Sequence, residues 1–231
     1  MVPFDSQWLV LLIVPALLLS FLAQLLVQLG LARGSKRGAK MSGYAAARQL
    51  LDGSGLYDVR VEQVPGHLNN HYDPRRGLLQ LSPDVYHGRD LSAVGTAAHE
   101  AAHAIQQHRR FRLLLRVRNV AVPAASFGSG AGILLALAGL VFRSPPLLAG
   151  GVVLFSGAVF LQLVNLPCEF DASWRARRRL LDLGVVHSTE LPPIKGVLNA
   201  AALTYLAATL QSTFTLVQWA ASALGGTRRG V

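Results

Sequence analysis

Residues 144–168 read SPPLLAGGVVLFSGAVFLQLVNLPC and contain no Asp, Glu, Lys or Arg. A helix of about 20 apolar residues crosses the hydrocarbon core of a bilayer, and this stretch is longer than that. Three more stretches, 6–32, 120–142 and 196–227, are uncharged in the same way. A chain of 231 residues is too small to bury four such helices inside a soluble core. The sequence therefore predicts four membrane-spanning helices.

The overall composition agrees with a membrane protein. Hydrophobic residues make up 52% of the chain and charged residues 15%, whereas soluble domains have about 25% charged residues. The first uncharged stretch has no basic leader and no clear cleavage site, so we interpret it as a permanent anchor rather than a signal peptide.

The placement of basic residues predicts the orientation. The formal net charge is +10, which would suit a nucleic-acid-binding protein. However, 19 of the 22 Lys and Arg residues lie between the first and second, or between the third and fourth, predicted spans. Basic loops stay in the cytoplasm. We therefore expect both of these loops to be cytoplasmic, the N-terminus to lie outside, and no nucleic acid to bind.

Residues 99–103, in the first of these loops, read HEAAH. Residues four apart on a helix are offset by about 40°, so His99 and His103 project from one face toward a shared ion. Glu100 follows about 100° further round, beside the fourth coordination position of a zinc ion. This spacing is typical of zinc peptidases, although chance produces it in roughly one chain per hundred of this length.

The residues around this motif predict a small mixed domain. One of its strands, at the edge of a sheet beside the motif helix, could bind an extended peptide by strand addition. The expected elements are a helix at 41–51 ended by glycines, a strand at 57–64, two antiparallel strands at 68–72 and 78–82, and a motif helix that begins at Asp90 or Ser92.

A third metal ligand is available where the third span ends. Glu169 and Asp171 are both candidates, and they lie about 200° apart on a helix, so only one can face the metal. Cys168 could bind zinc, but three nitrogen or oxygen ligands suit catalysis better, and a lone cysteine is more often a small apolar filler. We interpret the remaining histidines as non-catalytic: His67, His71, His87, His108 and His187.

Four short stretches have a pattern that is more specific than the motif alone. They are HYDP at 71–74, LSPDVY at 81–86, AHEAAHAIQ at 98–106 and EFDAS at 169–173. Through them the chain, up to about Leu224, resembles the YugP-like family of membrane zinc metallopeptidases and, more distantly, the HtpX-type proteases.

The resemblance implies a gluzincin site. In such a site His99 and His103 bind one catalytic zinc ion, Glu169 supplies the third ligand, and Glu100 is the catalytic carboxylate. The family usually has Val and Gly at positions 101 and 102, where this chain has two alanines, and Asn where it has Asp171. The last difference keeps Asp171 as an alternative third ligand.

Three other functions share features with this sequence. An intramembrane site-two-type protease also uses HExxH, and residues 51–53 read LDG as in that class, but this stretch precedes the zinc motif and lies in a polar segment. A channel or transporter is disfavoured because no predicted span contains a charged residue. A membrane scaffold or adaptor with a structural zinc remains the main alternative.

We therefore predict a mainly α, four-span helical membrane protein with a small α+β, zincin-like cytoplasmic domain. Its predicted function is that of a zinc-dependent metalloendopeptidase, embedded in the cell (inner) membrane, that cleaves protein substrates at the cytoplasmic face. Its partners are a protein or peptide substrate and the lipid bilayer, and a membrane partner protein is left open. The predicted divisions are span one at 6–32, the zinc-motif domain at 33–118, span two at 119–142, span three at 144–168, a cytoplasmic segment with the third ligand at 169–195, and span four at 196–227.

Overall fold

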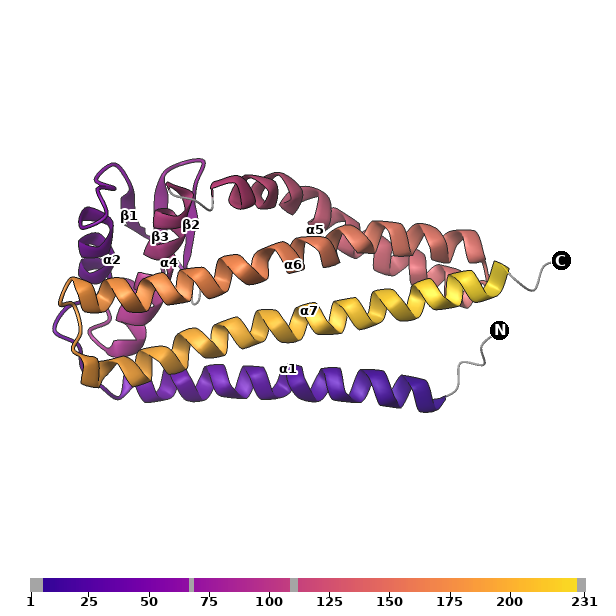
Figure 1. Cartoon of the computed structure of the whole chain (residues 1–231), viewed down its shortest axis with the longest axis horizontal. Coiled ribbons are helices and arrows are strands. Elements are labelled where there is room, and N and C mark those ends of the chain that lie inside the picture. Colours follow the sequence, from indigo (N-terminus) through magenta and orange to yellow (C-terminus); the bar gives the residue numbers. More distant parts are fainter. Residues whose placement is uncertain (1–5, 67–68, 109–111, 228–231) are drawn as a thin grey trace. The chain divides into compact units, whose positions relative to one another are not determined.

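A computed structural model describes residues 6–66, 69–108 and 112–227. Most of these residues lie in helices, and the strands form one small sheet (Figure 1), as predicted. The elements are α1 (Ser6–Ser35), α2 (Gly43–Asp52), β1 (Arg60–Gln63), β2 (His71–Asp73), β3 (Leu78–Leu81), α3 (Pro83–His87), α4 (Leu91–Gln107), α5 (Arg112–Val141), α6 (Pro145–Asp182), the short 3-10 helix η1 (Ser188–Glu190) and α7 (Leu191–Thr227).

Three helices in the described parts of the chain are long and apolar enough to cross a membrane. They contain the segments Leu17–Ser35, Pro145–Asp182 and Ser188–Ala223. The predicted span at 119–142 corresponds to a shorter apolar segment, Phe127–Val141, which is part of α5. The presence of membrane-spanning helices is thus supported by length and composition, and the count of four stays a prediction.

The chain divides into two compact units. The first comprises Met1–Leu22, Arg116–Leu166 and Tyr205–Val231, and the second comprises Ala23–Leu115 and Pro167–Thr204. In the first unit, the rings of Phe155 and Trp219 pack with their centroids 5.2 Å apart. The second unit contains the motif helix, the sheet and both candidates for the third ligand.

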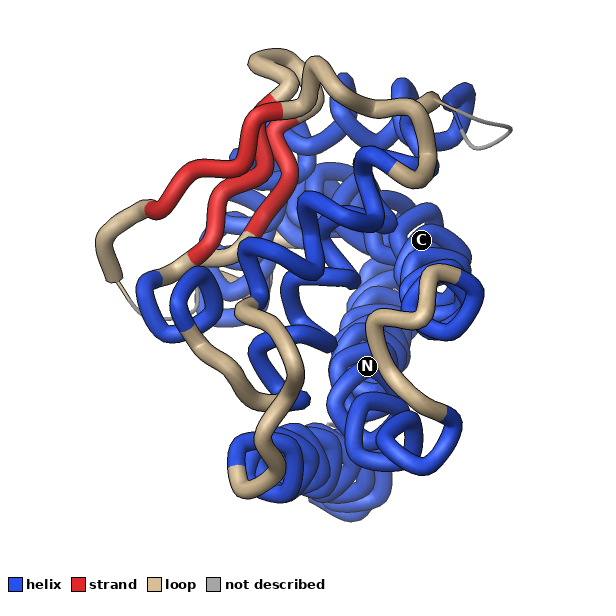
Figure 2. Tube along the Cα trace, turned by 90° about the vertical axis from the view of Figure 1, so that its left-hand side faces the viewer, coloured by secondary structure: helices blue, strands red, loops and turns tan. Residues whose placement is uncertain are grey.

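The sheet has three strands in the order β1-β3-β2. Its strands are the red segments of Figure 2. Strands β2 and β3 are antiparallel, with Tyr72 opposite Leu79, so the predicted antiparallel pair is confirmed. Residue 68, where we expected the first of these strands to begin, lies outside the described residues. Strand β1 is parallel to β3 and shorter than the predicted strand at 57–64.

Helix α4 begins as the sequence predicted. The Asp90 carboxylate accepts hydrogen bonds from the backbone N–H groups of Ser92 (2.9 Å) and Ala93 (3.0 Å), so Asp90 is the N-cap. The buried face of α4 is lined by small side chains that allow α2 and the sheet to pack closely against it. Five of its alanines have no solvent exposure: Ala97, Ala98, Ala101, Ala102 and Ala104.

Helix α2 ends at Asp52, and Gly53 is its C-cap. The LDG stretch at 51–53 therefore closes a short helix outside the candidate spans, as expected. Asp52 forms an ion pair with Arg48 (2.8 Å), one turn earlier in the same helix. This local contact accounts for the carboxylate without any role at a metal.

Helix α6 continues well beyond the predicted end of the third span. It runs to Asp182 without a break, although Pro167 lies inside it and removes one backbone hydrogen bond. Glu169 and Asp171 are therefore held on a continuous helix. This helix places them against α4, which carries the HEAAH motif.

Candidate metal centre

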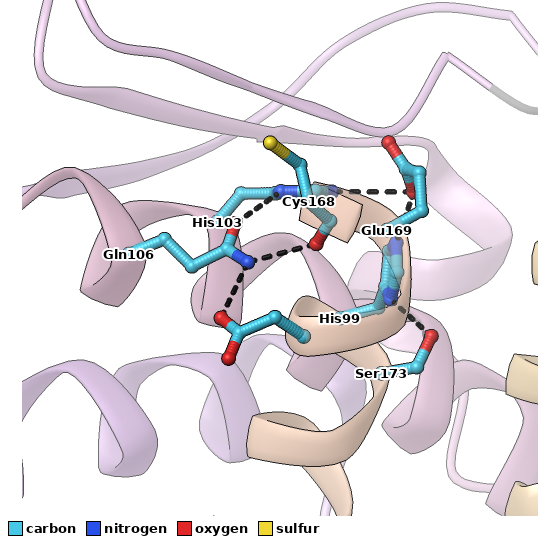
Figure 3. Close-up of polar contacts among 7 residues, drawn as sticks. His99, His103, Gln106, Cys168, Glu169 and Ser173 are labelled. Atoms are coloured by element: carbon cyan, nitrogen blue, oxygen red, sulfur yellow. Dashed lines mark hydrogen bonds and ion pairs between the residues drawn. The ribbon is translucent and has the colours of Figure 1, made fainter. Parts of the chain in front are cut away.

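Three side chains from two helices converge in the second unit. Helix α4 supplies His99 and His103, and α6 supplies Glu169 (Figure 3). One ligand atom from each residue lies within 4.8 Å of the other two. The two imidazole rings meet edge to face, with their centroids 4.7 Å apart. One helical turn separates the histidines, as the sequence spacing requires.

The distances between these atoms are those of ligands around an ion. The Oε2 atom of Glu169 lies 3.2 Å from Nε2 of His99 and 3.6 Å from Nε2 of His103. Two atoms that each lie about 2.1 Å from a tetrahedral zinc are roughly 3.4 Å apart. A charge-assisted hydrogen bond to a carboxylate is typically shorter, at about 2.7–2.9 Å, and the 3.2 Å contact lies at the long end of the hydrogen-bond range. The geometry of the donor set therefore fits a zinc ion.

Burial makes a cation at this position favourable. Glu169 is 3% exposed and His103 is 8% exposed. Burying a carboxylate costs free energy unless a positive charge or hydrogen bonds compensate for it. Within the described residues, neither Lys nor Arg forms an ion pair with Glu169, whose ionic contacts are the two imidazoles. A divalent cation would neutralise this carboxylate and leave both imidazoles uncharged.

Gln106 fixes the orientation of His103. Its amide nitrogen donates hydrogen bonds to the backbone carbonyl of Cys168 (2.8 Å) and to Oδ2 of Asp171 (2.7 Å). The amide oxygen, 3.0 Å from Nδ1 of His103, must therefore be the acceptor of that contact. His103 then carries its proton on Nδ1, which leaves the Nε2 lone pair directed at the ion position.

Asp171 lies on the far side of Gln106. Besides accepting from Gln106, its Oδ2 atom accepts a hydrogen bond from Nε of Arg175 at 2.5 Å. Asp171 is not part of the three-residue cluster, and neither is Cys168, which is fully buried and offers its backbone carbonyl to Gln106. Of the three candidates for the third ligand, Glu169 is thus the one whose side chain converges with both histidines in this structure.

The other described histidines also lie outside the cluster. His108 is exposed and contacts the carbonyl of Ala104, while His71 is exposed on β2. His87 contacts the side chain of Gln63, and His187 that of Lys40. The remaining one, His67, lies outside the described residues.

Sequence reasoning assigned no role to three residues of this centre. These are Gln106, Arg175 and Ser173, whose hydroxyl lies 3.4 Å from Nδ1 of His99. Gln106 could have been found, because it follows His103 by three positions and so lies on the same helical face. Arg175 follows Asp171 by four positions on α6, so this pair could also have been found from its spacing. The contact of Ser173 with His99 depends on the packing of α6 against α4, which no local pattern encodes.

The comparisons with known proteins agree with this chemistry. A sequence model of the family described as "Putative neutral zinc metallopeptidase" matches residues 9–223. The chain is also similar to "Putative membrane protease YugP" of Bacillus subtilis (strain 168). The two are 43% identical over 215 residues, which cover 92% of this chain and 95% of the relative. No solved structure matches the chain.

Proposed function

Because the chain belongs to the neutral zinc metallopeptidase family that its sequence matches, we propose that it is a membrane-embedded, zinc-dependent metalloendopeptidase. In this proposal it hydrolyses peptide bonds of protein substrates at the cytoplasmic face of the cell membrane. The observation that carries the proposal is the convergence of His99, His103 and Glu169 at the spacing of zinc ligands.

These three residues are the proposed ligands of one catalytic zinc ion. Three protein ligands leave a fourth position open, which is typical of catalytic rather than structural zinc sites. A zinc ion held by these residues would polarise a carbonyl oxygen and would lower the pKa of a water molecule toward about 7. The site therefore favours an enzyme over a scaffold with a structural zinc.

Glu100 is the proposed general base and acid. It follows His99 directly on α4 and is half-buried, so its carboxylate is held near the ligands on a rigid helix. In hydrolysis it takes a proton from the attacking water and passes it to the leaving amine nitrogen. Because Glu100 is not one of the three ligands, its two roles do not compete with metal binding.

Strand β2 is the proposed binding edge for an extended substrate. It is an outer strand of the sheet, and both β2 and β3 contact α4. An extended peptide can add to such an edge through main-chain hydrogen bonds, which accept many different side chains. Strand addition would present a peptide bond beside α4 in a fixed direction.

We include four membrane crossings in this proposal. Apolar segments of α1, α6 and α7 are long enough to span a bilayer, and α5, with 30 residues, extends over about 45 Å. The basic residues of the loops at 33–118 and 169–195 support a cytoplasmic position for the site. The N-terminus would then lie outside.

The replacement Glu100→Gln tests the mechanism. We expect cleavage of a fluorescently labelled, unfolded protein substrate by the purified full chain to fall by roughly 10²- to 10⁴-fold, because proton transfer is lost. Zinc content, measured by elemental mass spectrometry, should stay at one ion per chain. Glu62→Gln, at an exposed position on β1, is the matched control and should keep full activity.

Two results would reject parts of this account. Unchanged cleavage by the Glu100→Gln variant would exclude Glu100 as the general base. A wild-type protein that retains zinc but cleaves no protein substrate would favour the scaffold alternative.

A further inference from the structure

A cleft of about 870 Å³ lies between the end of α1 and the start of α7. Both of its walls belong to the second compact unit. Pockets for small ligands typically measure roughly 300–1,000 Å³, so the cleft is large enough for one. It is not part of the metal centre, since its lining contains none of the three converging residues.

The α1 wall changes from apolar to basic along the helix. Leu26, Leu29 and Arg33 follow one another at intervals of three or four residues. Such intervals place these residues on one helical face. The rise of 1.5 Å per residue puts Arg33 about 10 Å from Leu26 along the axis. Lys36 and Arg37 come directly after the end of α1 at Ser35 and add two more cations to the lining.

The wall formed by α7 and the residues before it also changes from apolar to polar toward the same end, but none of the described residues that line it is charged. Leu203, Asn199 and Gly196 also follow one another at intervals of three or four residues, and Thr189 lies at the polar end. Because the basic end of α1 and the start of α7 line the same cleft, one end is apolar and the other polar. A ligand that matches both walls must therefore be amphiphilic.

The cations of the cleft are available to a ligand. Arg33, Lys36 and Arg37 are all exposed. No Asp or Glu is among the lining residues, and within the described parts of the chain no carboxylate forms an ion pair with any of the three. The polar end therefore has a concentrated, uncompensated positive charge that is complementary to an anion.

Close helix packing makes the cleft part of the fold. A Cβ atom at Gly30 would lie 3.0 Å from the backbone carbonyl of Gly196, so the two helices approach each other at these glycines. Such small-residue crossings are typical of helices in membranes. Both helices contain candidate membrane-spanning segments, and the leucines of the cleft lie within those segments.

We propose that this cleft binds one anionic phospholipid. Its phosphate would contact Arg33, Lys36 and Arg37, and an acyl chain would lie along Leu26, Leu29 and Leu203. Basic pockets between membrane helices recognise anionic headgroups by this combination of charge and apolar surface. The leucines favour a lipid over free inorganic phosphate, because a small anion gains nothing from them. The site does not depend on proteolysis.

Lipid binding by the full chain can be measured by native mass spectrometry. The protein, in detergent micelles, would be titrated with phosphatidylglycerol and, separately, with phosphatidylcholine. The variant carries Arg33→Gln, Lys36→Gln and Arg37→Gln. We expect it to bind phosphatidylglycerol roughly 100-fold more weakly than the wild type, because each of the three basic residues contributes to the free energy of binding at an anionic lipid surface. Wild-type protein should prefer phosphatidylglycerol to phosphatidylcholine.

A matched control removes the same charge elsewhere. Arg60→Gln, Arg75→Gln and Arg76→Gln neutralise three exposed residues of the sheet region and should leave lipid binding within about twofold. Equal weakening in both triple variants, or no weakening in either, would overturn the proposal. So would equal affinity for the two lipids, or displacement of phosphatidylglycerol by an equal concentration of inorganic phosphate. If the cleft variant does not fold, Lys36→Gln alone should weaken binding roughly fivefold.

Discussion

At the scale of single residues, Gln106 links the metal centre to the rest of α6. It is fully buried and connects His103 to Asp171 and to the carbonyl of Cys168. We expect Gln106→Leu to weaken zinc binding by roughly 10- to 100-fold, because the orientation of His103 is no longer fixed. The unpaired buried groups should also lower the free energy of unfolding by about 1–3 kcal/mol. Zinc affinity would be measured by competition with a chelator.

Gln107→Leu is the control for this prediction. Gln107 is the next residue on α4 and is half-buried, and within the described residues no hydrogen bond joins it to His103, so the same substitution leaves the contact between Gln106 and His103 intact. A loss of zinc affinity in the Gln107 variant equal to that of the Gln106 variant would show that the effect comes from helix α4 in general. In that case Gln106 would not be a positioning residue.

The residues of the site differed in how readily the sequence revealed them. His99, Glu100 and His103 follow from spacing on one helix, which is a local property. Glu169 was preferred to Asp171 only through the family resemblance, since both lie near the same span end. Gln106 received no role, because a glutamine near a histidine is common and its partners at 168 and 171 come from a distant part of the chain.

At the scale of elements, α6 places Glu169 and Asp171 in different surroundings. The two lie about 200° apart on this helix. Glu169 contacts both imidazoles, whereas Asp171 contacts Gln106 and Arg175. Replacing a residue that only supports a metal ligand weakens metal binding by up to roughly 100-fold. We expect Glu169→Gln, which changes a proposed ligand, to weaken zinc binding by well over that factor. We expect Asp171→Asn to weaken it by roughly tenfold or less.

These two isosteric variants control each other, because each removes one negative charge from the same turn of α6. Asp171→Asn keeps an oxygen that accepts from Gln106 and loses the ion pair with Arg175. Zinc content of the purified variants, measured at equal protein concentration, separates the two assignments. Complete loss of zinc in Asp171→Asn with retention in Glu169→Gln would make Asp171 the ligand.

The boundaries of helices and the pairing of strands were predicted where short local patterns specify them. The N-cap of α4, the end of α2 and the antiparallel pair of β2 and β3 all follow from local chemistry. Helix α3 was not predicted, because five residues that begin with a proline are too short to show a helical period. The end of α6 was also not predicted, since charge marks the edge of a membrane span and not the end of a helix.

At the scale of the whole molecule, the site itself constrains how the chain crosses a membrane. His99 and Glu169 are in contact, so both must lie on the same side. The chain between them must then cross the membrane an even number of times. If the apolar part of α6 crosses once before Glu169, α5 must supply the other crossing. A fourth span is thus predicted without using the hydropathy of α5.

Accessibility of introduced cysteines tests this topology. Ser144→Cys lies in the connection between α5 and α6, and Arg76→Cys lies in the turn between β2 and β3. We expect a membrane-impermeant maleimide to label Ser144→Cys in intact cells and to label Arg76→Cys only after the cells are permeabilised. The native Cys168 is fully buried and serves as the unlabelled background. If both positions were labelled only after permeabilisation, α5 would not cross, and a single crossing by α6 could not bring Glu169 to His99.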